Sequence, residues 1–295
     1  MPKTTFKELL DAGVHFGHLK RKWNPAMAPY IFMERNGIHI IDLEKTITRL
    51  DEAASAMKQM AKSGKKILFV ATKKQAKEIV AEKVKNVNMP YVTERWPGGM
   101  LTNFPTIRKA VKKMGSIDKM ASDGTFMNLS KRERLQITRQ RAKLEKNLGS
   151  IADLTRLPSA LFVVDVCKEH IAVREAKRLG IPVFAMVDTN SDPSEIDFPI
   201  PANDDASKSI SLIVDILCQS IDEGLNERKI EKEKEFLPKE KSLARKDVEA
   251  TDTSDSHEEV TADENEEKSK DENTSDKLDN DKDAVDSDKG SEEED

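Results

Sequence analysis

Short, continuous apolar runs alternate with amphipathic helical patterns along most of this chain, and this alternation restricts the fold more than any other feature of the sequence. An apolar run without polar alternation is typical of a strand buried on both faces of a parallel sheet. Such runs lie at residues 38–41, 66–71, 89–93, 160–165 and 182–187. Helical patterns lie at residues 45–62, 73–87, 169–179 and 206–228. The alternation predicts an α/β fold built on a doubly wound, five-stranded parallel sheet with right-handed crossovers.

A basic segment, residues 103–148, interrupts this alternation. Two helical stretches, 103–120 and 130–148, are joined by turn-forming residues at 122–125, so an antiparallel hairpin is the simplest arrangement. A narrow apolar seam is available to hold the hairpin together: Ile107, Val111, Met114, Leu135, Ile137, Leu144 and Leu148. The segment contains 12 basic and 4 acidic residues, a net charge of +8. We expect an inserted arm that lies along an anionic partner, with a solvated helix pair as the alternative.

Charge is distributed unevenly along the chain. Residues 1–240 have 41 basic and 32 acidic side chains, a net charge of +9, as expected of a protein that binds a polyanion. Residues 241–295 have 8 basic and 22 acidic side chains, a net charge of −14, and too few aliphatic residues for a core. They are predicted to be a disordered acidic tail. The expected division is one α/β domain from 1–102 and 149–228, the arm, a helical extension or linker at 229–240, and the tail.

Residues 95–104, Arg-Trp-Pro-Gly-Gly-Met-Leu-Thr-Asn-Phe, stand where the alternation gives way to the arm. The two glycines permit backbone angles or a close approach that other residues do not. Arg95 and Trp96 can contact phosphate or stack on a base. The residues expected to contact nucleic acid here are Arg95, Trp96, Gly98, Gly99, Thr102 and Asn103. The alternative is a strand-to-helix loop with Trp96 packed and Thr102 or Asn103 as a helix cap.

A second loop, residues 20–24, combines three basic side chains with an aromatic ring. Its residues are Lys20, Arg21, Lys22, Trp23 and Asn24. In the functional interpretation the cations neutralise phosphate and Trp23 offers a stacking face. In the alternative the loop is a solvated basic turn with Trp23 in the core.

Motifs for nucleotide or acyl chemistry are missing. No G-x-G-x-x-G follows the first or second predicted strand, and Ser63-Gly64-Lys65-Lys66 lacks the upstream glycine and the hydroxyl residue of a phosphate loop. No G-x-S-x-G nucleophile elbow occurs, and Asp165 and Asp188, at strand ends, have no nucleophile or base beside them. We therefore expect no enzyme and no small-molecule substrate, with a nucleotide or sugar-phosphate enzyme on the same sheet as the rival hypothesis.

One group of residues is suited to binding a metal ion. His15 and His18 precede the first strand, Asp188 follows a strand, and Asp204 and Asp205 open the last helix. In a parallel sheet these positions can meet at the carboxyl edge, where imidazole and carboxylate hold a divalent ion such as zinc or magnesium. The candidate ligands are His18, Asp188, Asp204 and Asp205. The alternative is a helix N-cap role for Asp204 or Asp205. No cofactor is otherwise expected.

Cys167 and Cys218 are the only cysteines, which excludes a disulfide framework and a four-thiolate zinc site. Both are expected to be buried thiols. Residues 1–7 lack an apolar signal core, and no apolar run approaches the roughly 20 residues that span a bilayer. A cytoplasmic location without a membrane partner is expected.

Five strings in this chain resemble the bacterial form of small-subunit ribosomal protein two. They are Ala12-Gly13-Val14-His15-Phe16-Gly17-His18, Trp23-Asn24-Pro25, the run from Arg95 to Asn103, the run from Leu157 to Asp165, and the run from Gly180 to Pro193. The likeness covers about residues 3–228 and includes the position of the arm. The acidic tail is a departure, since it is longer than the usual bacterial ending.

The resemblance implies a flavodoxin-like sheet with an inserted coiled-coil arm that binds small-subunit ribosomal RNA. In the arm, Arg108, Lys109, Lys112 and Lys113 are expected to contact phosphate. The chain would be a ribosome-bound structural component of the small subunit, without catalytic residues. Its partners would be other small-subunit proteins, among them the large, multi-repeat first protein. A free regulator that binds messenger RNA is the remaining rival.

Overall fold

A parallel sheet of five strands, in the order β5-β4-β6-β7-β8, organises the protein. The structure is a computed structural model that describes residues 4–249, apart from the side chains of 127, 128 and 235–249. The strands are β4 (Ile67–Val70), β5 (Tyr91–Val92), β6 (Ala160–Val164), β7 (Val183–Val187) and β8 (Phe198–Pro201). Counted along the chain their order is 2-1-3-4-5, the order of flavodoxin-like sheets. The predicted doubly wound, five-stranded parallel sheet is confirmed.

One strand of the prediction was assigned to the wrong sheet. Residues 38–41 form β3 (Ile38–Ile41), which pairs antiparallel with β1 (Phe16–Leu19) and β2 (Ile31–Arg35) in a separate three-stranded sheet. The fifth parallel strand is β8, which the sequence pattern did not indicate because Pro199 and Pro201 interrupt it. Proline lacks the N–H that a central strand needs, and β8 is an edge strand that pairs only with β7.

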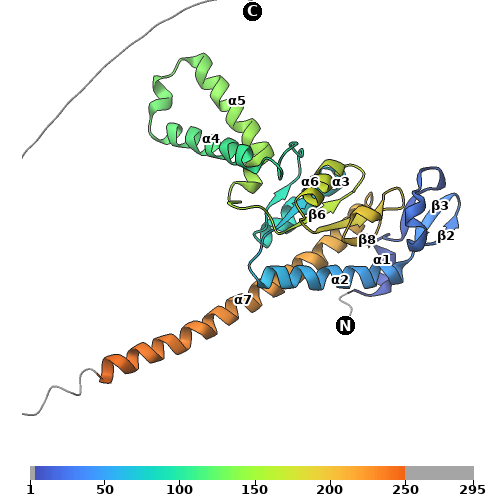
Figure 1. Ribbon diagram of the computed structural model, residues 1–295. Coiled ribbons are helices and arrows are strands. Elements are labelled where there is room, and N and C mark those ends of the chain that lie inside the picture. The colour runs from blue at the N-terminus through green and yellow to red at the C-terminus, as the bar shows by residue number, and fades with distance from the viewer. Residues whose placement is uncertain (1–3, 250–295) are drawn as a thin grey trace, which may run out of the picture. The chain divides into compact units, whose positions relative to one another are not determined.

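Helices cover both faces of the parallel sheet (Figure 1). One face packs against α2 (Leu43–Lys62), α3 (Lys74–Asn86) and α7 (Ser207–Glu249), with Phe69, Phe162 and Phe184 fully buried beneath them. The other face packs against α6 (His170–Arg178) and the base of the arm. Helix α1 (Phe6–Asp11) begins with a capping box between Thr5 and Glu8. Two buried faces explain why these strands read as unbroken apolar runs.

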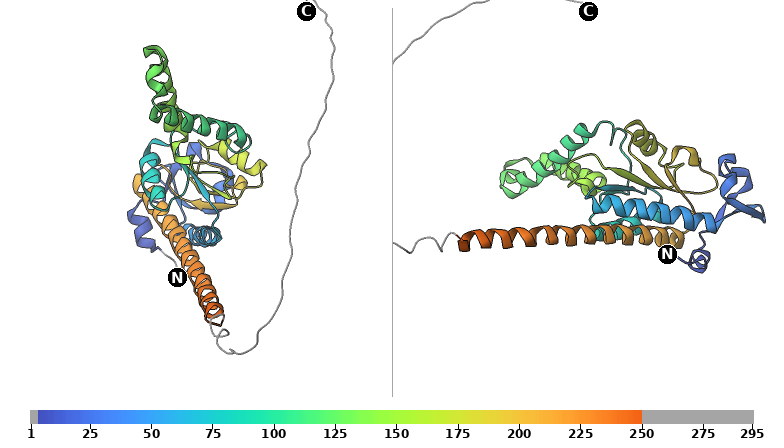
Figure 2. Two further views of the ribbon diagram at one scale, coloured as in Figure 1. Left: turned by 90° about the vertical axis from the view of Figure 1, so that its left-hand side faces the viewer. Right: turned by 60° about the horizontal axis from the view of Figure 1, so that its bottom comes forward.

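Helix α7 lies alongside α2, as the right-hand view of Figure 2 shows. It continues beyond residue 228, where the predicted helix ended, and includes the predicted extension or linker at 229–240. Residues 241–249, the start of the predicted tail, are also helical, because nothing in their composition breaks a helix. The rest of the predicted acidic tail, 250–295, lies outside the described residues. No helix in residues 4–249 combines the length and apolar character that crossing a membrane requires.

The arm is a pair of helices inserted between β5 and β6 (Figure 1). Helix α4 (Phe104–Ser122) and α5 (Lys131–Leu148) are joined by the short 3-10 helix η3 (Thr125–Asn128). A capping box between Ser130 and Glu133 starts α5. The predicted seam is buried mainly at its base, where Ile107, Val111 and Leu144 pack against the α/β core, whereas Leu135 is 52% exposed. A coiled-coil geometry for the pair stays a prediction.

Candidate nucleic-acid interface

The basic loop after β1 presents its cations to solvent. Lys20–Lys22 form a 3-10 turn, η1, in which Arg21 and Lys22 are exposed and Lys20 pairs with Glu34 at 2.7 Å. Trp23 is half-buried, and its ring lies 5.1 Å from that of His39. Stacking of Trp23 on a base stays a prediction. Asn24 is structural: its side-chain oxygen accepts from the N–H of Ala26 at 2.9 Å and caps the next 3-10 turn, η2 (Pro25–Tyr30).

The loop that leads into the arm divides into an exposed and a buried part. Arg95 and Gly98 are exposed. Trp96 is only 7% exposed and its Nε1–H donates to Glu175 at 3.2 Å, so the expected stacking face is not accessible and the alternative of a packed Trp96 holds. Asn103 stands at the N-cap of α4, but its side chain does not cap the helix and instead accepts from Thr106 Oγ1 at 2.8 Å.

Glu175 organises this loop, and sequence reasoning missed it. Its carboxylate accepts from the indole N–H of Trp96, the backbone N–H groups of Gly99, Leu101 and Thr102, and the Thr102 hydroxyl. Burial by itself raises the pKa of Glu175, but the donors outweigh it and the net pKa is lowered. A signal existed in the sequence, since Glu175 falls on the apolar face of α6 beside Ala172, Val173 and Ala176.

The predicted arm residues do not all face solvent in the same way. The guanidinium of Arg108 donates to the carbonyl oxygen of Leu154 at 2.8 Å and has a longer contact with that of Ala152 at 3.4 Å, so it ties α4 to the chain that leaves the arm. Lys109, Lys112 and Lys113 are exposed on α4. Further exposed cations that the sequence analysis did not single out are Lys119, Lys131, Arg132, Arg139 and Lys143.

A second polar cluster lies at the carboxyl edge of the parallel sheet, centred on Lys73. Its Nζ is 2.7 Å from carboxylate oxygens of Asp204 and Asp205 and 3.4 Å from one of Asp165. Burial lowers the pKa of Lys73, but these carboxylates outweigh it and raise the pKa above its usual value. Asp165 follows β6 with φ of +70°, a left-handed conformation that is uncommon for a residue other than glycine and is often found at functional sites.

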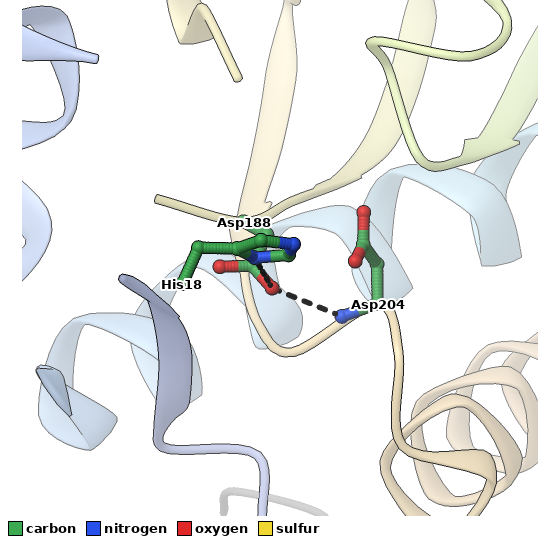
Figure 3. Close-up of side chains that lie close together, drawn as sticks. All are labelled: His18, Asp188 and Asp204. Carbon is green, nitrogen blue, oxygen red and sulfur yellow. Dashed lines mark hydrogen bonds and ion pairs between the residues drawn. The ribbon is translucent and has the colours of Figure 1, made fainter. Parts of the chain in front are cut away.

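The expected metal-binding residues are brought together at the same edge. His18 Nδ1 lies 3.0 Å from Asp188 Oδ2, and His18 Nε2 lies 3.3 Å from Asp205 Oδ2. Figure 3 shows His18 and Asp188 facing each other with Asp204 beside them, and one ligand atom from each lies within 4.8 Å of the others. Contact with Asp188 raises the pKa of His18 despite burial. Asp204 is fully buried, and its Oδ2 has no hydrogen-bond partner among the residues that the structure describes. Burial together with Asp188 and Asp165 raises the pKa of Asp204.

The chain's own side chains fill the position where flavodoxin-like sheets bind ligands, between the carboxyl ends of β4 and β6. Glu169, which is 3% exposed, accepts from the backbone N–H of Thr72 at 3.0 Å and from the Thr72 hydroxyl. Lys168 Nζ donates to the carbonyl oxygen of Thr72 at 2.9 Å. Together with Lys73 these contacts occupy the edge that a nucleotide phosphate would need.

The cysteine prediction is half wrong. Cys218 is buried, and burial raises the pKa of its thiol to about 12. Cys167 is exposed, because it lies in the turn after β6 rather than on the apolar face of a helix, and its Sγ is 3.4 Å from Ser191 Oγ.

The fold is therefore that of a parallel α/β domain with an inserted basic helical arm, in which the chain's own side chains fill the edge of the sheet. A sequence model of the family described as ribosomal protein S2 matches residues 9–224. The chain belongs to this ribosomal protein family, and the expectation that it is not an enzyme is confirmed by that membership.

Named relatives agree with the family. The small ribosomal subunit protein uS2 of Phocaeicola vulgatus is 78% identical over 232 residues, which cover 79% of this chain and 83% of that protein. The uS2 protein of Porphyromonas gingivalis is 78% identical over the same length, with the same coverage. That of Azobacteroides pseudotrichonymphae is 71% identical over 244 residues, which cover 83% of this chain and 93% of that protein.

Proposed function

We propose that this chain is a structural component of the small ribosomal subunit, ribosome-bound in the cytoplasm, and that its arm and two adjoining loops bind small-subunit ribosomal RNA. Membership of the ribosomal protein S2 family carries the proposal. The net charge of +8 on the arm supplies the physical basis, since cations that neutralise phosphate release counterions and drive association. Partners in this assembly include other proteins of the small subunit.

The exposed cations of α5 provide the best-defined contact surface. Arg132, Arg139 and Lys143 are separated by seven and four positions, so they lie along one face of the helix. Among the described residues they form no ion pair with an acidic side chain, whereas Arg141 pairs with Asp118 and Glu145. The stripe is about 16 Å long, which is the length of several phosphates along a duplex. Lys109, Lys112 and Lys113 on α4, Arg95, and Arg21 and Lys22 supply further contacts.

A triple variant tests this surface. Replacing Arg132, Arg139 and Lys143 by Gln should weaken binding to small-subunit ribosomal RNA, and the slope of log affinity against log salt should become shallower by about 2–3, since each phosphate contributes roughly 0.7 to 0.9. The matched control changes Lys7, Lys65 and Lys208, exposed lysines of the α/β domain, to Gln. Equal losses in both variants would mean that overall charge, and not the arm, carries binding.

An apolar groove beside the small antiparallel sheet suits a protein partner. Its volume is about 470 Å³. Phe6, Leu10, Phe16, Phe32 and Met33 line the groove, and each is 44% to 69% exposed. Exposed large apolar side chains in one patch are typical of interaction sites. We assign the groove to the large first protein of the small subunit, the partner that the family resemblance implies.

The groove is tested by changing Phe32, its most exposed side chain, to Glu in cells. Small subunits purified from that strain should contain the variant chain at full occupancy and should lack most of the first protein, measured by quantitative mass spectrometry. Ile171→Glu, at an exposed apolar position on α6, is the matched control. Normal amounts of the first protein in the Phe32→Glu subunits would remove this assignment.

A divalent metal at His18, Asp188 and Asp204 is a second, separate proposal. The carboxylates of Asp165, Asp188, Asp204 and Asp205 meet here, facing His18 and Lys73, and the charge of Lys22 also lowers the pKa of Asp205. The unpartnered Oδ2 of Asp204 adds a free ligand atom. One imidazole and two carboxylates suit zinc, and carboxylates alone suit magnesium.

Elemental analysis decides whether a metal is held. The purified protein should contain close to one equivalent of zinc or magnesium, which His18→Ala should remove and His170→Ala, at an exposed histidine, should not. Absence of a stoichiometric metal from the unmodified protein would end this proposal and leave the RNA-binding proposal untouched.

A further inference from the structure

The carboxylate of Glu175 is surrounded by donors from one short loop. Oε1 accepts from Trp96 Nε1–H at 3.2 Å and from the N–H of Gly99 at 2.7 Å. Oε2 accepts from the N–H of Leu101 at 2.9 Å and from the N–H and hydroxyl of Thr102 at 3.2 and 3.3 Å. Glu175 is 8% exposed. A buried carboxylate with five donors is stabilised in its charged form and holds each donor in place.

The donors belong to the chain that enters the arm. Thr102 lies two residues before α4 begins at Phe104, and the N–H of Asn103 donates to the carbonyl oxygen of Gly99 at 2.8 Å. Gly99 has φ of +82°, and a Cβ there would lie 3.2 Å from Cβ of Asn103, so the loop depends on glycine at this position. The direction in which α4 starts is therefore set by a loop whose polar groups converge on one side chain of α6.

The chain that leaves the arm is anchored by different groups. Arg108 donates to the carbonyl oxygen of Leu154, and the Ser150 hydroxyl donates to that of Tyr91. Glu94 lies 3.3 Å from both Lys77 of α3 and Lys146 of α5. These contacts do not involve Glu175, so loss of Glu175 removes one of the two sets of contacts that hold the base of the arm. Both arm helices should still form, because α5 keeps its capping box and the base keeps its apolar contacts.

We propose that Glu175 is a positioning residue for the basic arm: through the loop 96–102 it fixes the direction of α4 and α5 against the α/β domain, so that the arm meets RNA already oriented. The expected effect on RNA affinity rests on the proposed RNA-binding function, whereas the positioning of the arm by Glu175 does not. Glu175 touches no RNA in this account. Without Glu175 the arm must be ordered when it binds, and this cost lowers the affinity for RNA. The number of phosphate contacts does not change, so the slope of log affinity against log salt stays the same.

The direct test measures a distance distribution between two spin labels. Labels are placed at Gln136→Cys on α5 and Gln75→Cys on α3, both exposed positions, in a Cys167→Ser background, with the buried Cys218 left in place. The protein with Glu175 should give one narrow distribution, and Glu175→Gln a broad one, with helix content by circular dichroism unchanged. Gln keeps the size of Glu but turns an NH2 group toward the N–H donors.

Two further variants keep the test decisive. Trp96→Phe removes one donor and retains a buried ring, so it should fold and broaden the distribution partly. Thr102→Val removes only the hydroxyl donor and keeps the backbone N–H, so it should leave the distribution narrow. Narrow distributions in Glu175→Gln and Trp96→Phe would overturn the proposal. If Glu175→Gln does not fold, a narrow distribution in Trp96→Phe overturns it and a broadened one supports it.

RNA binding supplies the second readout. Glu175→Gln should bind small-subunit ribosomal RNA about tenfold more weakly with the same salt slope, a loss on the scale of one charge-assisted hydrogen bond. A shallower slope would mean that phosphate contacts were lost, and would contradict positioning. If the unmodified protein does not bind RNA, the proposed function fails, while the distance measurement still decides whether Glu175 positions the arm.

Discussion

Three charged side chains in the interior of this protein hold loops and strand ends in place. Glu175 gathers the loop before the arm, Glu169 fills the gap at the end of β4, and Lys73 holds three carboxylates together at the sheet edge. Glu175 and Glu169 are buried and Lys73 is largely buried, and each is paired with groups from distant parts of the chain. Breaking such a group is costly because its partners remain buried without it.

Glu175 should make stability depend on pH in a defined direction. Its pKa in the folded protein is lowered from 4.5, so its contribution is fully present above that value and is lost as pH falls through the lower, folded value. Glu175→Gln should therefore reduce the free energy of unfolding by about 2–3 kcal/mol at neutral pH. Urea unfolding measured from pH 7 to pH 3 should show that the difference in free energy of unfolding between the unmodified protein and Glu175→Gln becomes smaller as the pH falls. A difference that widens as pH falls would contradict this assignment of charge.

Lys73 offers a test by double substitution. Lys73→Met should destabilise the fold by about 3–5 kcal/mol, because it leaves Asp204 and its neighbours without their cation. Adding Asp204→Asn removes one of those charges and should restore part of the loss. Urea unfolding of both single variants and the double variant measures the coupling. Simple additivity of the two single losses would show that the pair does not interact as described.

At the scale of elements, close packing of α7 on α2 depends on a glycine. A Cβ at Gly224 would lie 2.4 Å from the carbonyl oxygen of Lys58 and 3.1 Å from Cβ of Ala61. The two helices thus approach more closely there than any side chain permits. Exposed ion pairs of Lys58 and Lys62 with Glu227 line the same contact, but such pairs contribute little.

Two glycine substitutions separate packing from helix propensity. Gly224→Ala should destabilise the protein by about 1–3 kcal/mol, since overpacking outweighs the better propensity of alanine. Gly115→Ala, in α4 with open space around the glycine, should stabilise by about 0.5–1 kcal/mol if the arm unfolds with the domain. Thermal unfolding of both variants checks the signs. Stabilisation by Gly224→Ala would show that the helices can move apart at no cost.

The helices and strands that were predicted correctly are those that the composition and periodicity of their own residues indicate. The buried runs at β4, β6 and β7 and the two helices of the arm follow from periodicity and composition alone. The assignment of residues 38–41 to the parallel sheet failed, because a short apolar strand looks the same in a parallel or an antiparallel sheet. Strand β8 was missed because Pro199 and Pro201 disguise an edge strand whose partner is decided by the tertiary fold.

At the scale of the whole molecule, the sequence predicted which residues come together at the candidate site, but not which partner each side chain contacts. Topology brought His18, Asp188 and Asp204 together as the strand ends suggested. Trp96 and Arg108 were expected at an RNA surface, yet they are held by Glu175 and Leu154, because long-range hydrogen bonds cannot be read from spacing. Lys73 escaped notice since a lysine in a lysine-rich segment gives no signal until three carboxylates surround it.

The central claim, that this chain is a structural part of the small ribosomal subunit, is tested most directly by sedimentation. Lysate is run through a sucrose gradient at moderate magnesium and again after a high-salt wash, and each fraction is probed for this chain. We expect comigration with small subunits and intact ribosomes in both gradients. Recovery at the top of both gradients would contradict it and would favour a free RNA-binding regulator or an enzyme on the same sheet.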